Sequence, residues 1–240
     1  MSTHAGRTGS RHRLLRICAA IALSFAAASA GAAALDALAQ KDAVTGLRTA
    51  LTQGASQAVA RLGVPNGFLG NPDVKILLPG KLQKAEKTLR MLGLGQQTDE
   101  LVTAMNRAAE AAVPEAKVLL VDAVKQMSVT DAKTILAGGD DAATQYFRSK
   151  TSDRLTAKFL PIVRKSTEKV GLTARYNAVA GRLSAVGVLD AKDANLESYV
   201  TSKTLDGLFL MMAKEEAAIR KNPLGQASSI LQRVFGSIGH

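Results

Sequence analysis

Apolar residues recur at helical spacing through almost the whole chain after residue 35, and this periodicity constrains the fold more than any other feature. Alanine, leucine, lysine and glutamate, all good helix formers, dominate these segments. Between Lys41 and Gly63, one apolar stripe consists of Val44, Leu47, Leu51, Ala55, Ala58, Val59 and Leu62. We therefore predict an all-α fold, a single bundle-like domain of about eight helices over residues 35–236, followed by a tail of residues 237–240.

Residues 63–80, GVPNGFLGNPDVKILLPG, interrupt the helical pattern. They contain three of the six prolines, so this segment cannot be one continuous helix. Apolar residues at every second position from Val74 to Leu78 predict a short extended piece. Such a segment is either a lid or binding edge, or a strap whose Phe68 and Ile76 complete the core. We favour the strap.

Two longer apolar stripes predict long helices. The first continues from Leu101 to Met127 straight through Pro114, which predicts one kinked helix or two nearly coaxial ones, with Thr98 as the N-cap.

The second long helix is predicted over Leu196 to Lys221, with Asn195 as its N-cap. Its LFLMMA turn is apolar all round, because Leu210 and Met211 fill the side opposite the main stripe. We expect neighbours to enclose that turn, and this helix to lie at the centre of the fold.

Three further helices complete the prediction. One covers residues 152–171 and bends near Pro161, and Thr173 caps the next, over residues 174–187. A last short helix follows Pro223 and ends near Gly236.

The acidic stretch GGDD is interpreted as the boundary between two helices. Gly138 and Gly139 are expected to end a short helix that begins at Asp131, by adopting the left-handed conformation. Asp140 or Asp141 is then expected to cap the following helix. The alternative is a metal site, but the regular acidic spacing of a calcium loop is absent.

The first 34 residues predict a secretory signal peptide. Four arginines and no acidic residue precede an apolar run that ends in small residues, which offers cleavage after Ala30 or after Ala34. A membrane-spanning helix is the alternative, but the run is short and alanine-rich. We therefore expect a periplasmic protein without a transmembrane segment in its mature form. Cleavage lowers the formal net charge from +11 to +7, because four arginines leave.

The expected mature chain lacks the side chains of several common catalytic centres. The only cysteine, Cys18, and two of the three histidines, His4 and His12, lie in the leader, and His240 is the last residue. Ser-His-Asp and Cys-His machinery and zinc sites built from His and Cys are thus excluded, and we predict no cofactor and no metal. Few aromatic residues also argue against single-stranded nucleic-acid binding, so no nucleic acid is expected.

One polar cluster is a candidate ligand site. Asn106, Arg107 and Glu110 share a helix whose other face is apolar, and Arg107 can pair with Glu110 or with an aspartate of GGDD. Tyr146 and Arg148 follow GGDD closely enough to join them. The alternative interpretation is a buried salt bridge that fixes the register of the helices. The full candidate set is Asn106, Arg107, Glu110, Asp140, Asp141, Tyr146 and Arg148.

Four segments resemble an exported bacterial family known as domain of unknown function 4197. They are GFLGNPDVKILLP, MNRAAEAAVPEA, GGDDAATQYFR and LDGLFLMMAKEEAAIRKNP, and the similarity covers about Leu35 to Gly236. The resemblance implies an all-helical, signal-bearing protein of Gram-negative bacteria. It implies no activity, cofactor or catalytic residue.

Three functional hypotheses follow. The first is a non-catalytic periplasmic protein that binds an apolar or anionic ligand, an anionic envelope component or a partner protein. The second is a histidine-free hydrolase or metal-dependent enzyme that uses Glu110, Asp140 and Asp141. The third is a purely structural envelope protein. We favour the first, because catalytic groups are absent and the net charge is positive.

Overall fold

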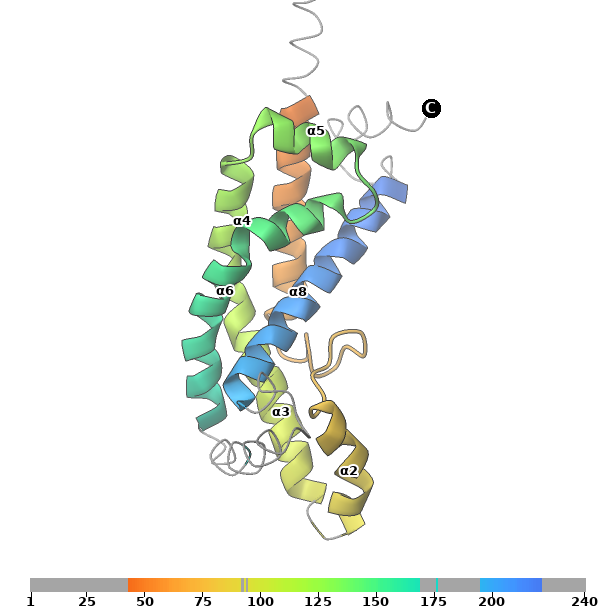
Figure 1. Ribbon diagram of the computed structural model, residues 1–240, viewed down its shortest axis with the longest axis vertical. Coiled ribbons are helices and arrows are strands. Elements are labelled where there is room, and N and C mark those ends of the chain that lie inside the picture. Colours follow the sequence, from red (N-terminus) through yellow and green to blue (C-terminus); the bar gives the residue numbers. More distant parts are fainter. Residues whose placement is uncertain (1–42, 92, 94, 169–175, 177–194, 222–240) are drawn as a thin grey trace, which may run out of the picture. The chain divides into compact units, whose positions relative to one another are not determined.

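The fold of the described chain is entirely helical. The computed structural model describes residues 43–91, 93, 95–168, 176 and 195–221, and no strand occurs among them. A helix covers residues 43–62, and Figure 1 shows the labelled helices that follow. These are α2 (Gly80–Met91), α3 (Gly95–Ala112), α4 (Ala116–Lys125), α5 (Val129–Ala137), α6 (Ala142–Glu168) and α8 (Leu196–Lys221). The predicted all-α class is confirmed for these residues.

The chain forms two compact units, Met1–Thr45 and Gly46–His240. The contacts described below belong to the second unit. The predicted signal peptide, the predicted helix over residues 174–187 and the predicted last helix lie outside the described residues, apart from Tyr176. No helix among the described residues has the length and the apolar character needed to cross a membrane.

Pro114 divides the long predicted helix into two. A single 3-10 turn, Val113–Glu115, separates α3 from α4, and α4 continues in nearly the same direction (Figure 1). This confirms the expectation of two nearly coaxial helices, because proline interrupts the hydrogen bonding of a helix without forcing a turn of the chain. The predicted cap is wrong: α3 begins at Gly95, and Thr98 lies buried inside its first turn.

A capping box begins α5. The Ser128 hydroxyl accepts a hydrogen bond from the Asp131 N–H at 3.0 Å, and the Asp131 carboxylate accepts one from the Ser128 N–H at 2.9 Å. The helix therefore begins at Val129 rather than at Asp131. Its end also differs from the prediction, because Gly138 has φ −83° and is not left-handed. Glycine is needed there for space, since a Cβ would lie 2.5 Å from the Cβ of Ala142.

The core forms where α6 packs against α3, α4, α5 and α8. Its largest fully buried side chains include Phe68, Phe147, Phe159 and Phe209. The predicted bounds of α8 are confirmed, and the Asn195 side chain caps it by accepting a hydrogen bond from the Ser198 N–H at 2.9 Å. The prediction that neighbours enclose the LFLMMA turn on every side is wrong, because Leu210 is 41% exposed.

Residues 63–79 form the predicted strap. Val74, Ile76 and Leu78 are buried, whereas Lys75 and Leu77 are exposed, so the side chains alternate between core and solvent. Phe68 is also fully buried, and the strap therefore completes the core as predicted. The strap lies directly against α8 at Gly207, where a Cβ would come within 2.7 Å of the Phe68 ring and 3.2 Å of the Val74 Cβ.

Candidate functional site

Three polar side chains of α3 hold the strap, and Asn106 holds one end of it. Asn106 is fully buried, and its side-chain amide forms two hydrogen bonds with the backbone of Ile76, as a residue of a neighbouring strand would. Its Oδ1 accepts from the Ile76 N–H at 2.8 Å, and its Nδ2 donates to the Ile76 carbonyl at 2.8 Å and to the Val102 carbonyl at 2.7 Å. One side chain thus satisfies both backbone groups of a buried strap residue.

Glu110 and Arg107 hold the other end of the strap. Glu110 Oε1 accepts from the N–H groups of Phe68 and Leu69, each at 3.0 Å, and its Oε2 binds the Arg107 guanidinium at 2.6 Å. Arg107 also donates to the Asn66 side chain at 3.0 Å. Asn66 is in the left-handed conformation, with φ 70°, which asparagine tolerates better than most residues. We call Asn106, Arg107 and Glu110 the strap anchor.

The strap anchor leaves Glu110 poorly placed for chemistry. Its side chain is only 5% exposed, and three donors occupy its two oxygens. The pairing of Arg107 with Glu110 is one of the two arrangements expected from the sequence. Its role is to position the strap.

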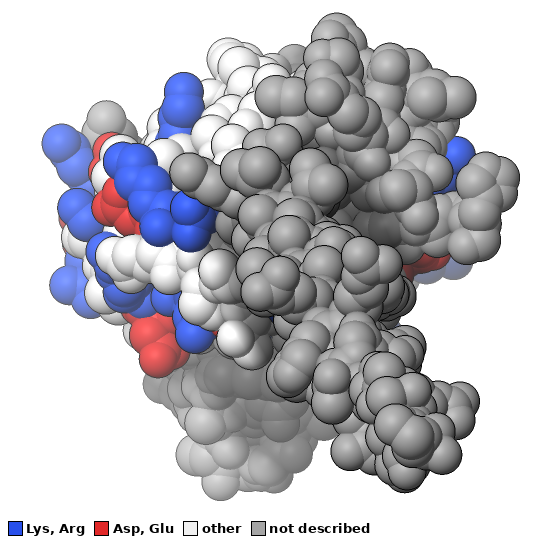
Figure 2. All heavy atoms as spheres, turned by 90° about the horizontal axis from the view of Figure 1, so that it is seen from above, with Lys and Arg blue, Asp and Glu red and all other residues white. Residues whose placement is uncertain are grey.

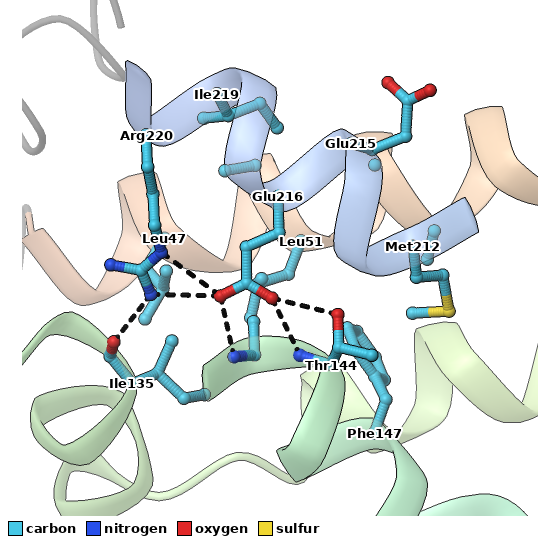
Figure 3. A pocket seen from close by; sticks show the side chains of 14 residues that line it. Leu47, Leu51, Ile135, Thr144, Phe147, Met212, Glu215, Glu216, Ile219 and Arg220 are labelled. Atoms are coloured by element: carbon cyan, nitrogen blue, oxygen red, sulfur yellow. Dashed lines mark hydrogen bonds and ion pairs between the residues drawn. The ribbon is translucent and has the colours of Figure 1, made fainter. Parts of the chain in front are cut away.

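The aspartates of GGDD do not cap α6. The N–H groups of Ala143 and Thr144 donate to the Glu216 carboxylate, at 2.8 and 2.9 Å, and the Thr144 hydroxyl donates to it at 2.9 Å (Figure 3). The expectation that Asp140 or Asp141 supplies this cap is therefore wrong. Both aspartates are exposed, and Asp141 accepts a hydrogen bond from the Gln145 side chain instead.

Arg220 completes this second polar cluster. Its guanidinium donates to Glu216 at 3.0 Å and to the Ile135 carbonyl, near the end of α5, at 2.8 Å (Figure 3). The carboxylate thus lies at the positive end of α6, and the guanidinium lies at the negative end of α5. Glu216 and Arg220 join three helices, and the sequence offered no local signal for either contact.

A small apolar cavity lies beside this cluster. Its lining comes from the helix over residues 43–62 and from α5, α6 and α8, and includes Leu47, Leu51, Phe147, Met212 and Ile219 (Figure 3). Its volume of about 30 Å³ has room for a water molecule or two but not for an organic ligand.

Tyr146 and Arg148 take part in neither polar cluster. Tyr146 donates to the Ala123 carbonyl at 2.8 Å, and burial, followed by the nearby Asp131 charge, raises the pKa of its hydroxyl. Arg148 lies over the Phe209 ring at 4.7 Å and reaches Asp206 at 3.8 Å, so it links α6 to α8. Of the predicted candidates, the contacts bring together only the three members of the strap anchor.

A groove between the strap and α8 is a further candidate site. We call it the strap groove. It has a volume of about 540 Å³, within the range of about 300–1,000 Å³ that is usual for ligand pockets. Its lining residues are Asp73, Val74, Lys75, Ile76, Leu77, Leu78, Gly80 and Gln83 on one side and Tyr199, Ser202, Lys203, Asp206, Gly207 and Leu210 on the other.

The strap groove combines exposed apolar side chains with charged ones. Leu77 is 43% exposed and Leu210 is 41% exposed, and both line this groove. Lys203 lies 3.4 Å from Asp206 within the groove. None of these residues was predicted from the sequence to form a site. The available signals were a leucine at an outward position of the strap and another on the polar side of α8.

Acidic and basic side chains share the surface of the described residues. Lys150, Arg154 and Lys158 are exposed at intervals of four residues on α6, with Asp153 among them. Figure 2 shows basic side chains gathered on one flank of the described surface, with acidic ones between them. Among the described residues, no group of three or more His, Cys, Asp or Glu side chains is placed to hold a metal ion.

The fold and these contacts define an all-α protein whose extended strap is fixed by buried polar side chains and borders an open groove. The chain belongs to the family described as protein of unknown function DUF4197, whose sequence model matches residues 37–236. Comparisons with curated proteins and with solved structures find no match.

Proposed function

We propose that this chain is an exported, non-catalytic binding protein that takes an amphipathic anionic ligand, or a partner with that chemistry, in the strap groove. Export is supported by the basic and apolar leader of residues 1–34. It is also supported by the family match, which begins at residue 37, just after both expected cleavage sites.

The non-catalytic character is supported by the chemistry of the residues present. Apart from His240, the chain after residue 34 has no histidine, and it has no cysteine. The hydrolase alternative needs Glu110 as an acid, base or nucleophile, yet three hydrogen bonds already occupy this side chain. Protonation of Glu110 would weaken its ion pair with Arg107 and its hydrogen bonds from the strap.

The observation that carries the proposal is the fixed strap beside an open groove. Buried polar groups are costly unless they are hydrogen-bonded, and the strap anchor uses two of them to fix one extended segment. The result is a rigid wall that holds Leu77 opposite α8 in the groove. Rigidity of a binding wall lowers the entropic cost of binding, which is how a preformed site gains affinity.

The ligand chemistry follows from the residues of the groove. Leu77 and Leu210 offer apolar surface that an alkyl or side-chain methyl group would cover. Lys75 and Lys203 line the same groove together with Asp73 and Asp206. Lys214 pairs with Asp73 and Arg148 pairs with Asp206 from outside the groove lining, so the ammonium groups of Lys75 and Lys203 favour an anionic end. Decanoate has both features and serves as a minimal probe.

Isothermal titration of the processed protein with decanoate tests the proposal. We expect binding that weakens at least tenfold in Leu210→Glu, because the substitution removes apolar contact and adds a like charge. Val118→Glu is the matched control, since Val118 is 66% exposed on α4 and lies outside the groove lining. Decyltrimethylammonium should bind more weakly than decanoate. Equal binding of decanoate by the Leu210 variant would refute the proposal, and so would absence of binding by both decanoate and an amphipathic anionic peptide.

Export is tested separately, by fractionating a Gram-negative host that expresses the full-length sequence. The proposal predicts periplasmic protein whose intact mass corresponds to a chain beginning at Gly31 or at Leu35. Full-length chain retained in the cytoplasm or membrane would contradict it.

A further inference from the structure

The two edges of the extended strap differ in how their backbone groups are satisfied. In an extended chain, the N–H and C=O groups of one residue point to one edge and those of the next residue point to the other. The Ile76 groups point toward α3, where Asn106 binds both. The groups of Lys75 and Leu77 therefore point to the opposite edge.

That opposite edge faces α8 across the strap groove. The Leu77 carbonyl accepts a hydrogen bond from the Tyr199 hydroxyl of α8 at 2.9 Å, which fixes the direction of the edge. The Lys75 N–H is used in a turn, donating to the Asn71 carbonyl at 2.9 Å. Within the described part of the chain, the Lys75 carbonyl and the Leu77 N–H have no hydrogen-bond partner.

These two groups have the spacing of a parallel strand pair. In such a pair, one residue of the incoming strand donates its N–H to residue i−1 and accepts from the N–H of residue i+1. An incoming residue beside Ile76 would meet the Lys75 carbonyl and the Leu77 N–H in that way. The Tyr199 hydroxyl occupies the Leu77 carbonyl, which is the next acceptor along this edge, so the paired stretch would end at that point.

We propose that the occupant of the strap groove is an extended peptide segment of a partner protein, which adds to the free edge of the strap as a parallel strand. This inference rests on the proposed function, since it names the occupant of the same groove. Main-chain hydrogen bonds supply part of the affinity in this mode, and side-chain pockets supply the specificity. Here Leu77 and Leu210 select apolar side chains, and Lys203 selects a carboxylate.

The probe is a capped, fluorescein-labelled hexapeptide of alternating glutamate and valine. The processed protein is titrated into it, and binding is followed by fluorescence anisotropy. We expect saturable binding that Leu210→Glu weakens at least tenfold and that Val118→Glu leaves unchanged. Each of the two central residues of the peptide is then N-methylated in turn. The peptide that loses the N–H facing Lys75 should bind about twofold to tenfold more weakly than the parent peptide, which is the loss in affinity expected for one hydrogen bond.

The outcomes separate this inference from the proposed function. Binding of decanoate without binding of the peptide would overturn the strand-addition proposal and leave the groove as a small-molecule site. Equal binding of the parent and both N-methylated peptides would overturn it as well, because pairing with the strap edge requires a backbone N–H. Absence of binding by both probes would refute the proposed function together with this inference.

Discussion

Replacement of Asn106 by alanine tests the structural basis of the groove. The substitution leaves the Ile76 N–H and C=O without their partner in a buried position. The Val102 carbonyl is less affected, because as a residue of α3 it also takes part in the helical hydrogen bonding. Each unsatisfied buried group costs about 1–3 kcal/mol. Water that enters the vacated space can bind one of the two groups, so we expect the free energy of unfolding to fall by about 2–3 kcal/mol.

Urea unfolding followed by circular dichroism measures this loss, and amide hydrogen exchange at Ile76 locates it. The Ile76 amide should be strongly protected in the parent protein and should exchange much faster in Asn106→Ala. Thr103→Ala is the matched control on the same helix; Thr103 is exposed, so its replacement should change the free energy of unfolding by less than about 0.5 kcal/mol. A loss below 1 kcal/mol in Asn106→Ala, with Ile76 still protected, would refute the assignment of Asn106 as the anchor of the strap.

Three further predictions concern the caps and the packing of the helices. Glu216→Ala should lower the free energy of unfolding by about 1–2 kcal/mol, because it removes the cap of α6. Asp141→Asn should lower it by less than about 0.5 kcal/mol. Equal losses for the two variants in urea unfolding would contradict the assigned cap. Gly207→Ala should lower the free energy of unfolding by about 1–3 kcal/mol, because the added methyl group would collide with the ring of Phe68 in the strap. Gly139→Ala is the control, since a methyl group there meets open space. An unchanged melting temperature for both variants would contradict the close contact between the strap and α8. The hydrogen bonds from the N-cap serine, Ser128, lower the pKa of Asp131. The capping box should therefore stabilise the protein at pH values above the usual aspartate pKa and lose this effect as the pH falls through the lowered pKa. An NMR titration that gives an ordinary pKa for Asp131 would contradict this.

Most helices could be predicted because their signals are local. The bounds of α8 follow from the cap at Asn195 and from a continuous stripe that ends before Pro223. The strap follows from its prolines and from the alternation at Val74 to Leu78, and the break in the long helix follows from Pro114.

One wrong prediction concerns a helix end where a residue far away in the sequence forms the contact that the sequence assigns to a neighbouring residue. The N-cap of α6 was assigned to the nearest aspartates, but Glu216, more than 70 residues away, occupies the N–H groups. A cap supplied from another helix has no sequence spacing by which to find it. The sequence predicts a left-handed Gly138, but its φ is −83°; a glycine is needed there because a Cβ would lie 2.5 Å from the Cβ of Ala142.

The candidate site was only partly predictable for the same reason. Asn106, Arg107 and Glu110 were recognised as a polar cluster on an otherwise apolar helix, but the sequence did not reveal that their partners are backbone groups of the strap. Lys203 and Leu210 become candidates only when the strap is placed beside α8.

The most direct test of the account is a two-dimensional amide NMR titration of the processed protein with decanoate and, separately, with the glutamate–valine hexapeptide. The account predicts that the largest shifts occur at Leu77, Lys203 and Leu210, and that the Leu77 amide becomes protected from exchange only with the peptide. Shifts confined to the cavity beside Glu216, or no shifts with either probe, would contradict the assignment of the strap groove as the binding site.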